Sequence, residues 1–167
     1  MAPRDEVPPP TVRPAIAADI PALGRLGVEL VTVHHGFDAQ RFLAPLPGTA
    51  EGYGSYLGSQ LGKKGIVILV AERGGRVLGY SYAALEGVDY MALRGPAGAL
   101  YDVVVNPGSR GQGIGKQLLE ATLDALRALG APRVVLSTAE QNAAAQRLFA
   151  RAGFRRTMIE MTRELDD

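Results

Sequence analysis

One continuous stretch predicts a strand, a glycine-rich turn and the start of a helix: Leu100-Tyr101-Asp102-Val103-Val104-Val105-Asn106-Pro107-Gly108-Ser109-Arg110-Gly111-Gln112-Gly113-Ile114-Gly115-Lys116. The residues from Tyr101 to Val105 are mainly apolar and β-branched, which is typical of a buried strand. Asn106 and Pro107 end that strand. From Ile114 apolar residues recur at helical spacing, until Gly130 stops the helix.

The turn between this strand and helix has the features of an anion site. The first N–H groups of a helix have no partners inside the helix and lie at the positive end of its dipole. Gly111, Gly113 and Gly115 let a ligand approach the backbone because they carry no Cβ. The stretch therefore predicts a site for a phosphate or a pyrophosphate. A glycine-rich turn without a ligand is the alternative.

The spacing of the glycines excludes two common phosphate-binding loops. A Walker A loop needs glycine where Arg110 stands and Ser or Thr after its lysine, whereas Gln117 follows Lys116. A Rossmann fingerprint needs Gly-x-Gly-x-x-Gly, and here the third glycine comes one residue early. The pattern that fits is Arg-x-x-Gly-x-Gly, formed by Arg110, Gly113 and Gly115. After a buried strand, this pattern resembles the signature of the GNAT N-acetyltransferase superfamily.

A second pattern strengthens the resemblance. Asn142-Ala143-Ala144-Ala145 leads through Leu148-Phe149 to Gly153-Phe154, which resembles the closing Asn…Ala…Leu-Tyr…Gly-Phe pattern of the family. The resemblance extends over residues 11–165. It implies an α/β GNAT fold: a mixed, mostly antiparallel sheet with a central parallel βαβ unit, splayed at the cofactor cleft.

Local patterns predict the same order of elements along the chain. Residues 1–10 are rich in proline, so we expect a disordered N-terminal arm there, followed by a single domain over residues 11–167. Strands are expected at 11–15, 66–72, 77–85, 100–105 and 133–138, and in a last extended segment that begins at Phe154 and includes 158–162. Helices are expected at 19–33, 49–61, 114–129 and 142–152, with a loop from His34 to Pro47.

Composition limits the kind of protein this can be. With 167 residues and a net charge of +1, the chain is long enough for one sizeable core and has no bulk charge that favours nucleic acid or an anionic membrane. It contains no cysteine and only two histidines, which are adjacent, so we expect no metal site. No apolar run approaches ~18 residues, and the first residues do not resemble a signal peptide. We therefore expect a cytoplasmic protein.

The resemblance implies acetyl-CoA as the cosubstrate and indicates where it binds. The strand backbone would pair with the pantetheine arm, and the amides of the turn would hold the pyrophosphate. Family members often have a β-bulge in this strand, which splays it from the next strand. Arg110 and Lys116 would add charge near the phosphates, or they are solvated surface charges. The residues implied for the cofactor are Val103, Val104, Val105, Arg110, Gly111, Gln112, Gly113, Ile114, Gly115, Lys116 and Asn142.

The resemblance does not supply the groups that move protons. Direct attack of an amine on the thioester needs an acceptor for the amine proton and a donor for the departing thiolate. In several family members a tyrosine seven residues after the asparagine is the donor, and in the branch that acts on protein N-termini a glutamate five residues before it is the base. These positions hold Phe149 and Ser137 here, so neither role can be carried over.

Three other residues are candidates for catalysis. Asp102 lies within an apolar strand, where a carboxylate is costly unless it is paired or hydrated, so it is either functional or bonded to a neighbouring backbone. Glu86 ends the second hairpin strand and either reaches the same cleft or is a solvated charge at a strand end. Tyr101 either donates a proton or packs against its neighbours.

The acceptor side of the cleft falls in residues 33–61 and 87–98. Tyr53 and Tyr56 have helical spacing, which indicates packing. His34 and His35 contact the substrate, or they are exposed loop residues without a role. Nothing in these segments identifies one amine.

The resulting hypothesis is an acetyl-CoA-dependent N-acetyltransferase that acts on a small-molecule or peptide amine. We expect no nucleic acid and no membrane as partners, and the resemblance leaves a homodimer open. A CoA-binding GNAT-fold sensor or interaction module without catalysis is the first alternative, and an unrelated nucleotide-phosphate binder is the second.

Overall fold

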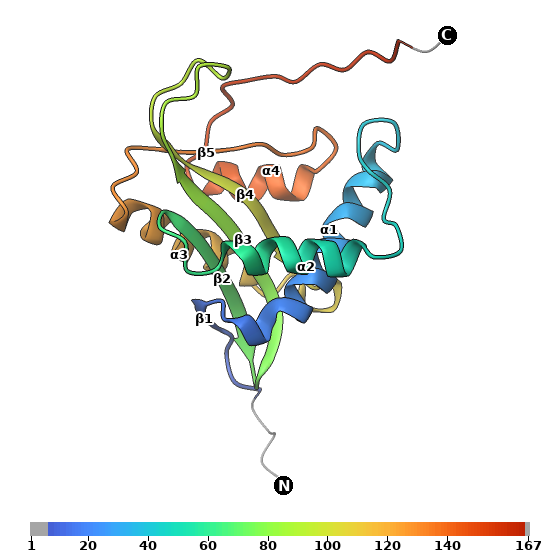
Figure 1. The fold of residues 1–167 in the computed structure, drawn as a ribbon, viewed down its shortest axis with the longest axis vertical. Coiled ribbons are helices and arrows are strands. Elements are labelled where there is room, and N and C mark those ends of the chain that lie inside the picture. The colour runs from blue at the N-terminus through green and yellow to red at the C-terminus, as the bar shows by residue number, and fades with distance from the viewer. Residues whose placement is uncertain (1–6, 166–167) are drawn as a thin grey trace, which may run out of the picture.

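The computed structural model describes residues 7–165 (Figure 1). Its strands are β1 (Thr11–Pro14), β2 (Ile66–Arg73), β3 (Arg76–Glu86), β4 (Ala97–Val105) and β5 (Val134–Leu136). Its α-helices are α1 (Ile20–Phe37), α2 (Thr49–Gln60), α3 (Ile114–Ala128) and α4 (Ala143–Arg151), with short 3₁₀ helices η1 (Ala17–Asp19) and η2 (Pro107–Ser109). Up to α4 this order is the one that the sequence predicts.

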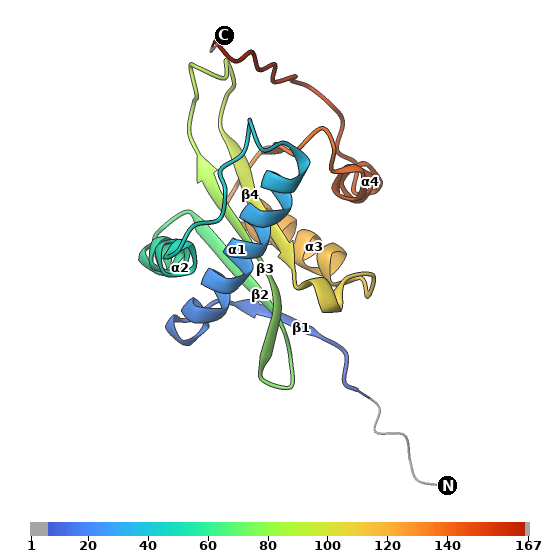
Figure 2. The same cartoon turned by 90° about the vertical axis from the view of Figure 1, so that its right-hand side faces the viewer.

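The described strands form one mixed sheet in the order β1-β2-β3-β4-β5. Each neighbouring pair from β1 to β4 is antiparallel, whereas β4 and β5 are parallel and are joined through α3. Helices α1 and α2 lie on one side of the sheet, and α3 and α4 lie on the other (Figure 2). The expected fold class, with its parallel βαβ unit, is thereby confirmed.

Each face of the sheet has its own apolar core. The residues that α3 buries on its face are Ile114, Leu118, Leu119 and Leu126. The side chains buried beneath α1 and α2 include Leu23, Leu26, Leu57, Tyr80 and Tyr82. The tyrosines bring hydroxyl groups into the second core, and buried hydroxyl groups need hydrogen-bond partners.

Glycines allow α1 and α2 to pack closely against each other. A Cβ on Gly24 would lie 2.2 Å from the carbonyl oxygen of Ala50, and a Cβ on Gly27 would lie 2.4 Å from the ring of Tyr53. Such distances are far below van der Waals contact, so a larger residue at either position would displace its neighbour. Glycine weakens an isolated helix, but here it determines where the Tyr53 ring lies.

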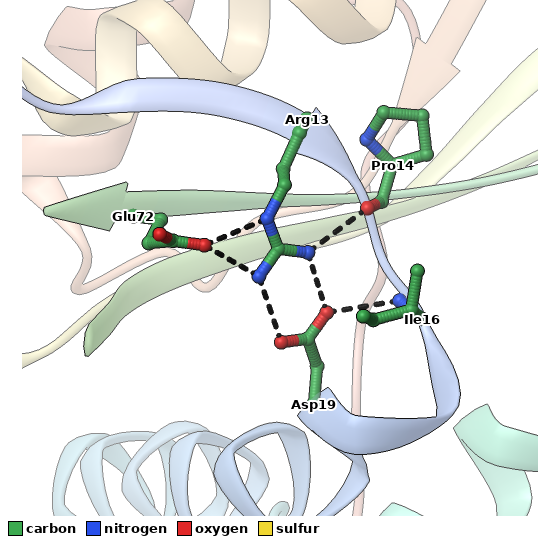
Figure 3. A network of polar contacts seen from close by, with 5 residues as sticks. All are labelled: Arg13, Pro14, Ile16, Asp19 and Glu72. Atoms are coloured by element: carbon green, nitrogen blue, oxygen red, sulfur yellow. Dashed lines mark hydrogen bonds and ion pairs between the residues drawn. The ribbon is translucent and has the colours of Figure 1, made fainter. Parts of the chain in front are cut away.

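An ion-pair network joins β1, β2 and the start of α1 (Figure 3). The guanidinium of Arg13 donates to Asp19 Oδ2 at 2.7 Å and Oδ1 at 3.0 Å, and its Nε donates to Glu72 Oε2 at 2.7 Å. The backbone N–H of Ile16 also donates to Asp19, at 2.9 Å. Asp19 therefore fixes the bend between β1 and α1 through a cation and a backbone group.

Two predictions about the elements are wrong. Helix α1 continues to Phe37, because no strong helix breaker intervenes, and His34 Nδ1 donates to the Leu30 carbonyl at 2.8 Å within it. The strand predicted after Phe154 is absent from the described chain. Residues 154–165 run away from the sheet (Figure 1), and Glu160 pairs with Arg41 instead of lying along a sheet edge.

The predicted N-terminal arm lies partly outside the described residues. Residues 1–6 are not described, and residues 7–10 carry neither helix nor strand. The predicted fifth strand is shorter than expected and spans only Val134–Leu136.

Candidate active site

The parallel strands β4 and β5 separate soon after they meet. Their pairing covers three residues of β4 and ends at Leu100. Beyond that point β4 keeps β3 on one side, and no other described strand lies on its second side. The N–H of Asn106 donates to the Leu78 carbonyl at 2.7 Å, so alternation along the antiparallel ladder directs the N–H and C=O groups of Val103 and Val105 to the free edge.

Val104 has the opposite arrangement. Its backbone faces β3 by the same alternation, and its side chain is buried in the core beneath α1 and α2. Of the three valines predicted to contact pantetheine, only Val103 and Val105 therefore present backbone groups to the free edge of β4.

A β-bulge lies where β4 leaves β5. Tyr82 of β3 pairs with Asp102, whereas the next residue of β3, Ala83, pairs with Leu100, so Tyr101 is an extra residue in β4. Neighbouring side chains of a regular strand point to opposite faces. Here the bulge lets both Tyr101 and Asp102 line the same cavity.

The glycine-rich turn ends at the N-terminus of α3, as the sequence predicts. Gly113 is the N-cap residue with φ 77°, and no side chain caps the helix there. Gly111 also has φ 77°, a backbone conformation that residues with a Cβ rarely adopt. The buried side chain of Ile114 anchors the first turn of α3 in the core, while the helix N-terminus carries uncapped N–H groups.

The polar side chains of the turn are held by nearby groups. Arg110 Nε donates to the Val105 carbonyl at 3.2 Å, and Gln112 Oε1 accepts from Arg73 Nη1 at 3.0 Å. Lys116 lies on the exposed face of α3 and pairs with Glu120 at 3.6 Å. Gly115 is inside the first turn of α3, where an added Cβ would lie 3.6 Å from the side chain of Leu148 in α4. Hydrogen bonds to β4 and β2 thus hold the turn on both sides, and no side chain caps the N-terminus of α3.

Asn142 caps helix α4. Its Oδ1 accepts the N–H of Ala145 at 3.1 Å, which occupies the oxygen and leaves the amide NH₂ for another acceptor. Of the two residues that replace the family's acid and base, Phe149 packs edge-on against Phe154 with ring centroids 5.8 Å apart, and Ser137 is exposed. Phe149 is thus a packing residue in this chain.

A cavity of about 400 Å³ lies at the bulge, on the side of the sheet that α1 and α2 cover. Its lining consists of Tyr53 and Tyr56 from α2, Tyr82 from β3, and Tyr101 and Asp102 from β4. The Tyr56 and Tyr82 hydroxyls lie 3.1 Å apart, and the Tyr82 and Tyr101 rings have centroids 4.9 Å apart. Four phenol rings and one carboxylate therefore surround the space.

Asp102 is buried with an exposed fraction of 8% and accepts two tyrosine hydrogen bonds. The hydroxyls of Tyr53 and Tyr80 both donate to Oδ2, at 2.7 Å and 2.8 Å. Burial raises the pKa of Asp102 above its ordinary value, although both hydrogen bonds and the charge of His34 on α1 act in the opposite direction. The second carboxylate oxygen, Oδ1, accepts no protein hydrogen bond among the described residues, so it can receive a proton.

Tyr101 and Glu86 form a second polar pair beside the cavity. The hydroxyl of Tyr101 donates to Glu86, and Arg94 forms an ion pair with the same carboxylate. Burial and the hydrogen bond to Glu86 raise the pKa of Tyr101, so its hydroxyl is protonated at neutral pH. Asp102 and Tyr101 thus lie at the bulge, and Glu86, at the end of β3, is joined to them through the Tyr101 hydroxyl.

Part of this cluster is not predicted by the sequence. Tyr53 and Tyr56 are expected to be packing residues, and no role is expected for Tyr80 or Tyr82. Their spacing indicates that they share a side: Tyr53 and Tyr56 have the i,i+3 spacing of one helix face, and Tyr80 and Tyr82 have the i,i+2 spacing of one strand face. Their convergence on Asp102 depends on how α2 packs over the sheet, which spacing does not show.

Residues 7–165 contain no group of three or more His, Cys, Asp or Glu side chains placed to hold a metal ion. None of the helices in that part of the chain combines the length and the apolar character needed to cross a bilayer.

Curated proteins with similar sequences include several acetyltransferases. The mycothiol acetyltransferase of Thermobispora bispora is 38% identical over 96 residues, which cover 55% of this chain and 31% of that protein. That of Streptosporangium roseum is 36% identical over 86 residues, which cover 52% of this chain and 25% of that protein. The chain thus spans about a third or less of the length of these relatives.

Solved structures share the fold at low sequence identity. The BH1408 protein of Bacillus halodurans superposes with a TM-score of 0.78 at 20% identity, covering 93% of this chain and 99% of that one. An acetyltransferase of Trypanosoma brucei superposes with a TM-score of 0.67 at 22% identity, with the same coverage. Residues 37–154 match the Acetyltransferase (GNAT) family, a range that contains the bulge, the glycine-rich turn and Asn142. The chain therefore belongs to the GNAT acetyltransferase family.

Proposed function

We propose that the protein transfers an acetyl group from acetyl-CoA to the nitrogen of an amine. The observation that carries this proposal is the bulge at Tyr101. It places a buried carboxylate beside the free edge of β4, and that edge leads directly to the open N-terminus of α3. Membership of the family and the named acetyltransferase relatives support acyl transfer.

The residues present fit acetyl-CoA at three points. Val103 offers its backbone N–H and C=O, and Val105 its N–H, to the amides of the pantetheine arm, in the manner of an added strand. The uncapped N-terminus of α3 and the positive-φ glycines before it suit a pyrophosphate. The free NH₂ of Asn142 suits a carbonyl of the pantetheine.

Asp102 is the proposed acceptor of the substrate proton. An alkylamine is an ammonium ion at neutral pH and must lose one proton before its nitrogen can attack. Asp102 takes that proton on the carboxylate oxygen that the tyrosines leave free, and returns it to water after the reaction. The thioester supplies an activated acyl carbon. The new C–N bond forms there as the C–S bond breaks.

Tyr101 is the proposed relay for the second proton. Once the nitrogen has attacked, it loses one further proton, and the departing sulfur gains one, so the products are an amide and a thiol. The Tyr101 hydroxyl, protonated at neutral pH, gives its proton to the sulfur and recovers one from the nitrogen. Its hydrogen bond to Glu86 holds the hydroxyl beside the cavity, and the proton leaves that hydrogen bond when it passes to the sulfur. Glu86 is therefore a positioning residue in this proposal.

The test is release of CoA from acetyl-CoA with a panel of primary amines, together with the variant Gly113→Asp. The aspartate would add a side chain and a negative charge where the pyrophosphate is proposed to bind, so CoA affinity should fall at least 100-fold. Gly130→Asp at the other end of α3 is the matched control, because Gly130 also has positive φ and open space around it. Equal CoA affinity in the folded variants would contradict the proposed site.

A CoA-binding module without catalysis is the second candidate function. The observation that favours it is the replacement of two family catalytic groups by Phe149 and Ser137, one packed and one exposed. Tight binding of acetyl-CoA without turnover of any amine would support this candidate over the enzyme.

We also propose that the protein forms a homodimer. Residues 154–165 leave the body of the molecule (Figure 1) and expose the large apolar side chains of Met158, Ile159, Met161 and Leu165. Such a stretch is typical of a surface that a partner covers, and a second copy provides the same stretch reciprocally. Light scattering coupled to size exclusion should give twice the 17.6 kDa chain mass. A monomeric mass at micromolar concentration would contradict this proposal.

A further inference from the structure

The cavity at the bulge holds a carboxylate that forms no ion pair within the described chain, and the one cationic group whose charge acts on it is His34 of α1. The ion pairs among residues 7–165 do not include Asp102, and its two donors are neutral phenols. Lys and Arg are absent from the cavity lining. A buried carboxylate usually has a cationic partner, because burial of an isolated charge is costly. An incoming cation would supply one.

The remaining lining of the cavity is aromatic. Tyr53, Tyr56, Tyr82 and Tyr101 each contribute to it, from three different elements. The face of a phenol ring attracts a cation through its quadrupole, and a group of such rings is a recurrent way of binding alkylammonium ions. The carboxylate and the rings therefore both favour a positively charged ligand.

The rim of the cavity adds to this preference. Glu86 lies beside Tyr101, and its own charge is already matched by Arg94, which also lies 3.8 Å from Asp89. Arg94 thus has two carboxylates and is not free to receive an acidic group of a ligand. The volume of about 400 Å³ lies within the range of small-molecule sites.

We infer that this cavity recognises the acceptor as a compact alkylammonium ion, with no acidic group near its nitrogen. The inference rests on the proposed function in one respect: it takes the cavity as the acceptor side of the reaction. The ammonium group lies among the tyrosine rings with Asp102 as its counter-ion, and its alkyl chain leaves past the half-exposed Tyr56 and Tyr101.

The experiment measures ligand binding without acetyl-CoA. Choline is the cationic probe, and 3,3-dimethyl-1-butanol is its uncharged counterpart of the same shape. The chain has six tyrosines and no tryptophan, so its fluorescence comes from tyrosine, and four of the six line the cavity. Choline should bind at least about 5-fold more tightly than the alcohol, as expected for one desolvated cation–π contact.

Two variants locate the binding. Tyr56→Leu should weaken choline binding about 5-fold, and its 54% exposure makes the change compatible with folding. Tyr90→Leu is the matched control, since Tyr90 is an exposed loop tyrosine outside the cavity. Equal affinity for choline and the alcohol, or an equal loss in the two variants, would overturn the inference.

The outcome is independent of acetyl transfer. If choline binds as expected but no amine is acetylated, the cation site is supported and the proposed enzyme activity fails. If amines are acetylated but choline shows no preference over the alcohol, the activity is supported and the ammonium inference fails.

Discussion

Two aspartates of this protein are almost fully buried, and their surroundings are opposite in kind. Asp19 is 5% exposed and Asp102 is 8% exposed. Asp19 receives a guanidinium and a backbone N–H (Figure 3), whereas Asp102 receives two tyrosine hydroxyls. Hydrogen bonds from Arg13 lower the pKa of Asp19, while burial raises that of Asp102.

This difference in hydrogen-bond donors distinguishes a carboxylate with a structural role from one that is suited to accept a proton or bind a cation. The charge of Asp19 is matched within the fold, so its burial contributes to stability and offers nothing to a ligand. The charge of Asp102 is only partly compensated, so it favours any process that brings it a proton or a cation. Burial alone therefore does not distinguish the two roles, but the nature of the partners does.

Asp102→Asn should produce the largest effect. The amide can still accept the tyrosine hydrogen bonds but cannot take a proton, so turnover should fall about 100-fold or more, with the affinity for CoA unchanged. Steady-state rates of CoA release and a separate titration with CoA measure the two quantities. Turnover within a factor of three of the native protein would show that Asp102 is not the base.

Asp19→Asn should affect stability instead of turnover. It removes one charge from a largely buried ion pair, but Arg13 is 33% exposed and water partly compensates, so we expect a loss of about 2 kcal/mol in the free energy of unfolding. Urea unfolding measures this loss, and turnover per folded molecule should be unchanged. A fall in turnover comparable to that of Asp102→Asn would remove the contrast between the two aspartates.

The pH dependence of stability should differ in sign between the two sites. The raised pKa of Asp102 means that its favourable contribution is complete below the ordinary aspartate pKa and is lost as pH rises through the raised value. The lowered pKa of Asp19 means that its contribution is present above the ordinary value and is lost as pH falls through the lowered one. Urea unfolding from pH 3 to about pH 8 measures how much more stable the native protein is than each Asn variant. This difference in the free energy of unfolding should fall with rising pH for Asp102→Asn and rise with pH for Asp19→Asn.

Tyr53→Phe should produce a smaller change that acts through Asp102. It removes one of the two hydrogen bonds that lower the pKa of Asp102, so that pKa should rise further. The acid limb of kcat/KM should move to higher pH, with a fall of about 10-fold or less near neutrality. An unchanged acid limb would indicate that another group controls it.

Gly27→Ala should produce the smallest effect on turnover. The added Cβ would meet the Tyr53 ring at 2.4 Å and displace it, which weakens its hydrogen bond to Asp102. The acid limb should move in the same direction as in Tyr53→Phe, with a cost of about 1–3 kcal/mol in stability from overpacking. Gly52→Ala, on the same helix pair with open space around it, is the control.

The order of elements and the conformation of the glycine-rich turn were predictable because they depend on short stretches of chain. Gly111 and Gly113 adopt the positive φ that a glycine-rich turn implies, and the turn leads into α3. A run of apolar residues defines β4 in the same local way. The predicted strand after Phe154 was wrong, because Glu160 pairs with Arg41, which is far away in the sequence. The predicted end of α1 was wrong for a local reason, because no strong helix breaker follows Val33.

The tyrosine-lined cavity was determined by contacts between segments far apart in the sequence. Strand periodicity places Tyr101 and Asp102 on opposite faces, and only the register of β4 against β3 reveals the bulge that brings them together. Helical spacing makes Tyr53 a core residue, and only the close approach of α1 and α2 directs its hydroxyl to Asp102. The local sequence was thus enough to predict that Asp102 is a buried carboxylate. Its hydrogen-bond partners depended on the packing of α2 and β3 around the bulge, which the local sequence does not determine.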